Sequence, residues 1–187
     1  MNKVKENGQL LKREADIIRY PMMRGGGLFL LLIGAGLICA IAFSGSNLVS
    51  YPIFFVGVGA ATVSLFAAGR LSKGSPTRIQ IAALASAILL EIVLFMIMGR
   101  TLPRGTTEHV RWLWVSIIVG VHFLPMTLCF GPRMLFLGFA CIANGVVGLL
   151  LPQVPYELFG LIDGFLKVVF GAWLLLTKTP NADSKRL

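Results

Sequence analysis

Five polar side chains lie inside otherwise apolar stretches of the sequence, and they are the residues best suited to chemistry. They are Glu91, His122, Asn144, Asp163 and Lys167. Carboxyl, imidazole and amino groups can hold or transfer a proton, and an amide can hydrogen-bond a solute. A charged side chain at the centre of a bilayer costs about 2.5 to 3.5 kcal/mol on insertion scales. Such groups must therefore find partners, which makes them candidates for a binding site.

Asp163 and Lys167 are four residues apart in the stretch FGLIDGFLKVVFGAWLLL. In an α-helix this spacing places them one turn apart on one face, where they can form an ion pair. Gly160, Gly164 and Gly171 share the same stripe. Because glycine lets a second helix approach closely, the stripe is expected to face another helix and not lipid.

The five polar residues are expected to meet in one layer of the membrane. At a rise of about 1.5 Å per residue, Asp163 and Glu91 come roughly 10 Å from the outer ends of their helices. His122 and Lys167 come near the midplane, and Pro125 frees a backbone carbonyl beside His122. We expect Glu91 to titrate within this midplane polar cluster and His122 to relay a proton. Asp163 and Lys167 would be the electrostatic partners of Glu91.

A structural role is open for each of these groups. Asp163 and Lys167 would clamp two helices equally well, and Asn144 is better explained as an interhelical hydrogen-bond donor than as a ligand contact. His122 would be satisfied by a neighbouring backbone carbonyl. Glu91 is the strongest functional candidate of the five, because its own helix offers it no cationic partner.

The elements that carry these residues are six apolar segments. Hydrophobic residues make up 56% of the 187 positions, charged residues only 13%, and mean hydropathy is +0.82. A helix of about 20 apolar residues crosses the hydrocarbon core of a bilayer. The predicted spans are 27–44, 51–68, 79–98, 110–130, 134–151 and 156–177. The sequence therefore predicts an all-α, polytopic integral membrane protein with one six-helix membrane domain over residues 27–177.

The aromatic residues support these boundaries, because Trp and Tyr prefer the membrane interfaces. Every Trp and Tyr lies at or near a predicted helix end: Tyr20, Tyr51, Trp112, Trp114, Tyr156 and Trp173.

The distribution of charge predicts how the spans are oriented. Most of the 17 Lys and Arg residues fall in the N-terminal segment, the second and fourth connections and the C-terminal segment. By the positive-inside rule, both termini should be cytoplasmic. Residues 1–26 would be a basic cytoplasmic tail, disordered or carrying a short interfacial helix, and residues 178–187 a cytoplasmic C-terminal tail. The net charge of +9 is then an orientation signal and does not indicate nucleic acid.

Motifs of catalytic or metal sites are not found in the sequence. There is no GxSxG, no HExxH and no phosphate-binding glycine loop. Cys39, Cys129 and Cys141 lie inside predicted spans without CxxC spacing, so we expect small apolar fillers and not a disulfide or a metal set. We therefore expect no cofactor and no enzymatic activity.

Four stretches carry a resemblance to known sequences: GSPTRIQ, VHFLPM, CIANGVVGLLLP and LFGLIDGFLKVVFGAWLLL. In order and spacing they resemble a family of small bacterial membrane proteins that is catalogued only as a domain of unknown function. The likeness covers about residues 74–178, whereas the first two predicted helices match it only in hydrophobic character. It implies a six-helix protein of the bacterial cytoplasmic membrane and brings no activity, substrate or catalytic residue.

Two functions follow from these residues. In the leading hypothesis, the polar cluster binds or conducts a small solute, a cation or a proton. In the alternative, the chain is a non-transporting accessory or structural membrane protein whose intramembrane charges only fix helix packing. Lipid is the expected surrounding in both cases, and stripes of small residues are compatible with a homo-oligomer as well as with internal packing.

Overall fold

The computed structural model is all-helical over the residues that it describes, which are 20–43, 47–67 and 76–177. The helices are α2 (Met23–Ala42), α3 (Asn47–Ala67), α4 (Arg78–Thr101), α5 (Glu108–Phe130), α6 (Arg133–Leu150) and α7 (Tyr156–Leu175). Each coincides closely with one predicted segment, and the first begins at Met23, before the predicted Gly27. Most of the predicted N-terminal tail and the whole predicted C-terminal tail lie outside the described residues.

Five of these helices, α2, α4, α5, α6 and α7, are long and apolar enough to cross a membrane. Their most apolar windows have mean hydropathies between 1.8 and 2.6. The prediction of an all-α protein with membrane-spanning helices is therefore confirmed for five helices. The remaining helix, α3, has 21 residues and contains Pro52.

Hydrogen bonds from the start of α4 hold it against the end of α5. Thr77 and Gln80 form a capping box, in which the Gln80 backbone N–H donates to the Thr77 hydroxyl at 3.3 Å and the Thr77 N–H donates to the Gln80 amide oxygen at 3.0 Å. The Gln80 amide also donates to the backbone carbonyl of Leu128, at 3.2 Å. Gln80 thus helps to fix where α4 begins and also attaches this end of α4 to α5.

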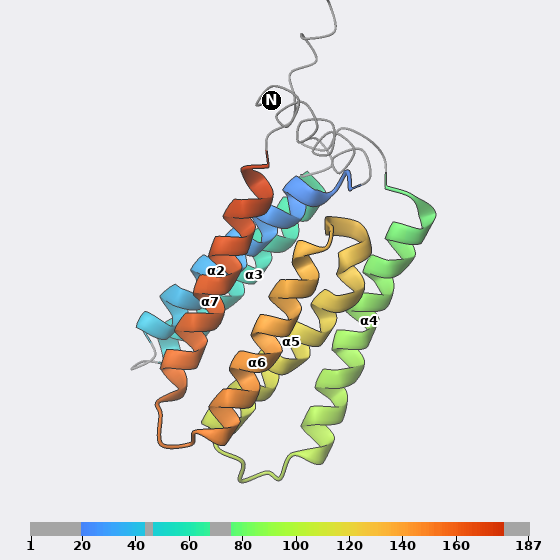
Figure 1. Ribbon diagram of the computed structural model, residues 1–187. Helices are drawn as coiled ribbons and strands as arrows, with labels where there is room; N and C mark the ends of the chain where they lie inside the picture. The colour runs from blue at the N-terminus through green and yellow to red at the C-terminus, as the bar shows by residue number, and fades with distance from the viewer. Residues whose placement is uncertain (1–19, 44–46, 68–75, 178–187) are drawn as a thin grey trace, which may run out of the picture.

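The helices form two groups that can be followed in Figure 1. On one side α7 packs along α2, and α3 packs on the other flank of α2. On the other side α5 packs between α4 and α6. The last helix of the chain therefore lies beside the first described one, and α6 and α5 join this pair to the rest of the bundle.

Glycine pairs bring the tightly packed helices together. A Cβ atom added to Gly34 of α2 would lie 2.7 Å from the backbone oxygen of Gly164 in α7, and one on Gly27 would lie 2.8 Å from that of Gly171. Between α5 and α6, a Cβ on Gly120 would lie 2.8 Å from the Gly138 oxygen. These backbones are too close for any side chain, so the glycine stripe predicted in α7 does face a helix.

The apolar core fills the half of the bundle that lies nearer the start of α2 and the end of α7. Its largest fully buried members are Leu30, Phe123, Phe130, Met134, Leu137 and Leu174. The opposite half, where α5 and α7 begin, contains the cavity described next.

Candidate functional site

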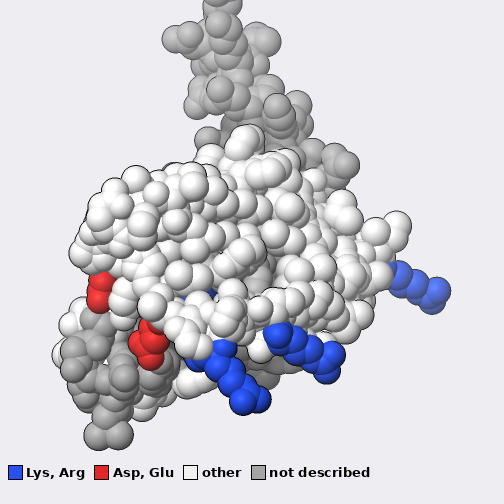
Figure 2. Space-filling view, turned by 90° about the horizontal axis from the view of Figure 1, so that it is seen from below, with Lys and Arg blue, Asp and Glu red and all other residues white. Residues whose placement is uncertain are grey.

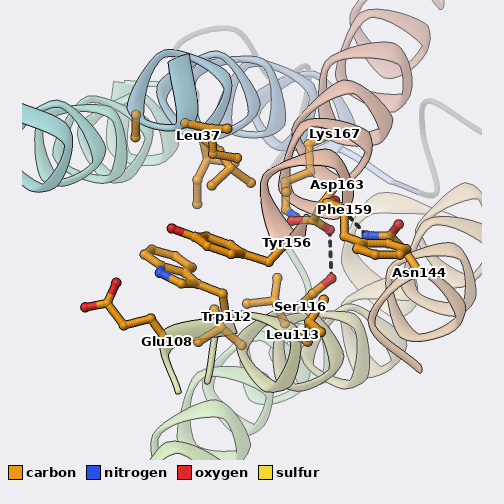
Figure 3. Close-up of a pocket in the computed structure, with 16 residues that line it drawn as sticks. Leu37, Glu108, Trp112, Leu113, Ser116, Asn144, Tyr156, Phe159, Asp163 and Lys167 are labelled. Carbon is orange, nitrogen blue, oxygen red and sulfur yellow. Dashed lines mark hydrogen bonds and ion pairs between the residues drawn. The ribbon is translucent and has the colours of Figure 1, made fainter. Parts of the chain in front are cut away.

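A cavity of about 100 Å³ lies between α2 and α5, with α7 and α6 forming its back wall (Figure 3). Apolar side chains make up most of its lining: Ile33, Leu37, Ala40 and Ile41 from α2, Leu113, Val115 and Val119 from α5, and Phe159 from α7. Polar groups lie at its two ends. Since one water needs roughly 10 to 15 Å³ of such volume, the space holds several waters or one small solute.

The inner end of the cavity is a buried polar trio. The Lys167 ammonium forms an ion pair with Oδ2 of Asp163. The Ser116 hydroxyl lies 3.2 Å from Oδ1 of the same carboxylate and 3.2 Å from the Cys141 backbone oxygen. Lys167, Asp163 and Ser116 are only 3%, 5% and 7% exposed. The predicted pair is therefore present, and both of its carboxylate oxygens are occupied.

Helix α7 positions this pair through its glycines. A Cβ on Gly160 would lie 2.4 Å from the Ile41 side chain, and one on Gly164 would lie 2.7 Å from that of Ile38. The two glycines therefore let α2 cover the face of α7 that carries Asp163 and Lys167. The Lys167 ammonium also lies 5.9 Å from the centre of the Phe123 ring, an arrangement that favours a cation over the ring face.

Glu91 and His122 form a second polar pair, between α4 and α5. Nδ1 of His122 lies 2.9 Å from the backbone oxygen of Ala87 and 3.3 Å from Oε2 of Glu91. A carbonyl oxygen can only accept a hydrogen bond, so Nδ1 carries the proton. His122 is buried, whereas the Glu91 side chain is 27% exposed. The backbone bond predicted as the structural explanation of His122 is thus present.

Asn144 joins α6 to α7. Its amide nitrogen donates to the Phe159 backbone carbonyl at 2.8 Å, and its side chain also lines the cavity. The interhelical hydrogen bond predicted for this residue is therefore present, to a backbone carbonyl.

The structure does not place the five predicted residues in one contact network. Asp163 and Lys167 lie at the inner end of the cavity, with Asn144 on its wall, whereas Glu91 and His122 contact each other between other helices. The expected single cluster is thus corrected to separate sites, because α4 contacts α5 and packs against neither α6 nor α7.

The outer end of the cavity contains residues that the sequence analysis did not assign to a site. Glu108 and Trp112 stand one turn apart on α5, and Tyr156 begins α7. The Tyr156 ring packs edge-on against His109, with 5.9 Å between ring centres. From the sequence, Trp112 and Tyr156 are expected only at a membrane interface. The spacing of Glu108, Trp112 and Ser116, every fourth residue of α5, was the signal that could have placed them on one face with the inner site.

Metal and disulfide chemistry has no geometric basis in the described part of the chain. No group of three or more His, Cys, Asp or Glu side chains there could hold a metal ion. Cys39, Cys129 and Cys141 are free thiols, and Cys129 donates to the Gln80 backbone oxygen at 3.0 Å.

The fold and the cavity together define a helical membrane protein with a partly apolar, partly charged internal site. The chain belongs to the Family of unknown function (DUF6609), whose model matches residues 13–184. The match confirms the predicted resemblance to a domain of unknown function and extends it over the first two helices. No curated protein and no solved structure gives a significant match.

Proposed function

We propose that this protein binds a small solute in the cavity between α2, α5, α6 and α7. The observation that carries the proposal is a buried, hydrogen-bonded ion pair at the inner end of an apolar cavity. Ligand sites are typically concave and mostly apolar, with a few polar groups that fix the ligand's orientation. Asp163 is already satisfied by Ser116 and Lys167, whereas an ammonium group has three donors, so Lys167 can also donate to a bound solute.

The membrane arrangement belongs to the same proposal. All six helices would cross the bacterial cytoplasmic membrane, with α3 as the sixth span and both termini in the cytoplasm. Basic residues in the N-terminal segment, in the α3–α4 connection, at the start of α6 and in the C-terminal segment support this orientation. The cavity would then open on the side opposite the cytoplasm, where α5 and α7 begin.

Binding is a better account of the cavity than catalysis or conduction. Ser116 has no histidine within hydrogen-bond reach, and its hydroxyl contacts the Asp163 carboxylate and a backbone oxygen. Beyond Lys167 the apolar core fills the bundle, so passage to the other side would need a second conformation. The alternative remains an accessory or structural protein, in which the ion pair only holds α7 and no solute enters.

Filling the cavity separates these accounts. Ala40 lines it, whereas Ala82 is exposed on α4, so Ala40→Phe and Ala82→Phe are matched substitutions. The melting temperature of the purified protein would be measured against a panel of small ammonium, carboxylate and neutral solutes. A solute that binds only the folded state raises the melting temperature in a concentration-dependent way. At 100 times its Kd, such a solute adds about 2.7 kcal/mol to the free energy of unfolding.

We expect at least one solute to stabilise the wild type and Ala82→Phe but not Ala40→Phe. A panel without any shift, or a shift that persists in Ala40→Phe, would favour the structural account. Because each variant is compared with itself in the presence and absence of solute, a change in its own stability does not confound the result.

A further inference from the structure

We infer that the ligand of this cavity is a small organic cation with apolar substituents, held by its ammonium group between Glu108, Trp112 and Tyr156. The inference rests on the proposed binding function and names the class of solute. It is carried by three features of the cavity: its charge, the aromatic residues at its outer end and its size.

The first feature is the charge of the lining residues. Asp163 and Lys167 neutralise each other at the inner end, where Ser116 completes their hydrogen bonds. The remaining charged residue of the lining is Glu108, at the outer end. The lining therefore carries one unmatched negative charge, which favours a monovalent cation.

The basic residues at this end of the bundle do not line the cavity. Arg111 is exposed, and its guanidinium donates to the Arg104 backbone carbonyl at 3.2 Å. Figure 2, which views this end of the molecule, shows acidic side chains toward the left and basic side chains along the lower edge and on the right, with some blue atoms close to one acidic group. A cation approaching Glu108 is thus not opposed by an arginine inside the site.

The second feature is a pair of aromatic rings beside this carboxylate. Trp112 lies one helical turn from Glu108, and the Tyr156 ring reaches across the space between α2 and α5 (Figure 3). An ammonium group within about 6 Å of an aromatic ring centre is attracted by the ring face, most strongly by Trp. An acid next to two such rings is the recognised chemistry for a substituted ammonium ion.

The third feature is the size and polarity of the space beyond the rings. Leu37, Leu113 and Val119 present hydrocarbon to the ligand, so its substituents should be apolar. A dry cavity of about 150 Å³ holds benzene, so the volume of about 100 Å³ found here suits a slightly smaller body. Tetramethylammonium, with about five non-hydrogen atoms, is of this size.

The test compares tetramethylammonium chloride with tert-butanol, a neutral molecule of nearly the same shape. Binding to the purified full-length protein would be followed by its melting temperature and by titration calorimetry. The variants are Glu108→Gln, which removes the charge and keeps the shape, Trp112→Leu, and the cavity-filled Ala40→Phe. Glu157→Gln is the matched control, because Glu157 lies in the first turn of α7 as Glu108 lies in the first turn of α5, but it is outside the lining.

We expect tetramethylammonium to bind the wild type and Glu157→Gln, to bind Glu108→Gln and Trp112→Leu about tenfold more weakly, and not to bind Ala40→Phe. Tert-butanol should bind at least tenfold more weakly than the cation. Equal binding of the two probes, or unchanged affinity in Glu108→Gln, would overturn the inference. If tert-butanol or a carboxylate binds and Ala40→Phe abolishes it, the binding function stands and only the cation is wrong. If no solute binds, both the proposed binding function and the inferred cationic ligand are wrong.

Discussion

Asp163 and Lys167 form an ion pair that is buried from both water and lipid, so each charge depends on the other. Removing one partner of such a pair leaves an uncompensated charge and costs about 3 to 5 kcal/mol, whereas replacing both with apolar residues is often nearly neutral. We therefore expect Lys167→Met and Asp163→Leu each to lower the unfolding free energy by about that amount. The double variant should recover most of the loss.

Melting temperatures of the three variants in one detergent would measure this coupling. If the double variant is as unstable as the sum of the single variants, the two residues do not form the pair described here.

Substitution of Glu91 is expected to affect stability and solute binding much less than its position in the sequence predicts. Its carboxylate contacts His122 from a partly exposed position and does not line the cavity. Glu91→Gln keeps a hydrogen-bonding oxygen toward Nδ1 of His122, so we expect its unfolding free energy to change by less than about 1 kcal/mol. Solute affinity in calorimetry should stay within a factor of about three. A loss of solute binding in Glu91→Gln would show that Glu91 belongs to the binding site.

Single residues differ in how much of their role the sequence reveals. Asp163 and Lys167 belong to one helix, so spacing alone predicted their contact. The contact of His122 with Glu91 depends on how α4 and α5 pack, which spacing within one helix cannot give. Ser116 carried no signal as an isolated residue, because a serine in a membrane helix is usually satisfied by its own backbone.

At the scale of elements, the seam between α2 and α7 is the contact that shapes the cavity's wall. A Cβ on Gly34 would lie 2.7 Å from the Gly164 backbone oxygen, so even alanine must push the two helices apart. We expect Gly34→Ala to lower the unfolding free energy by about 1 to 3 kcal/mol. In Gly59→Ala of α3 nothing lies within 4 Å of the added atom, so helix propensity should raise stability slightly.

The melting temperatures of these two variants should therefore move in opposite directions. Equal changes, or a stable Gly34→Ala, would contradict the close α2–α7 contact. The other end of α7 is held by an arginine from the start of α6. The Arg133 guanidinium donates to the Thr177 hydroxyl at 2.6 Å and lies 4.6 Å from the centre of the Trp173 ring, which ties the end of α7 to α6.

Helix positions could be predicted from apolar length, because the bilayer thickness requires about 20 residues in each span. Which helices pack against each other could not be predicted in this way. The glycine stripe of α7 predicted a partner helix, yet α2, α3 and α6 all carry small residues that would serve. The choice of α2 depends on the match of two particular backbones, at Gly27 with Gly171 and at Gly34 with Gly164.

For the whole molecule, the proposed orientation places the 102–107 connection outside the cell and the turn between α5 and α6 inside. Gly105 and Pro132 are exposed at these two places, so Gly105→Cys and Pro132→Cys are matched reporters. In a variant background with the native cysteines replaced by alanine, an impermeant maleimide should label Gly105→Cys in intact cells. It should label Pro132→Cys only after the membrane is opened. The reverse labelling pattern would show that the protein has the opposite orientation in the membrane.

The class of the molecule was predictable, whereas the cavity was not. Composition and hydropathy suffice for a helical membrane protein, because lipid requires every backbone polar group to be bonded within a helix. The cavity arises where α2 and α5 diverge on either side of α7, and no local pattern encodes that separation. Trp112 and Tyr156 therefore predicted only an interface, although both also line an internal site.

The central claim is that a solute can enter the space between α2 and α5 and reach the inner polar trio. Val119 lines that space, whereas Val169 is exposed on α7 at a similar number of residues from its helix start. The most direct measurement is the rate at which a small, water-soluble methanethiosulfonate reacts with Val119→Cys and with Val169→Cys in the same cysteine-free background. We predict fast modification of Val119→Cys, blocked by adding Ala40→Phe, and slow modification of Val169→Cys. Equal rates, or a Val119→Cys that does not react, would contradict an open cavity.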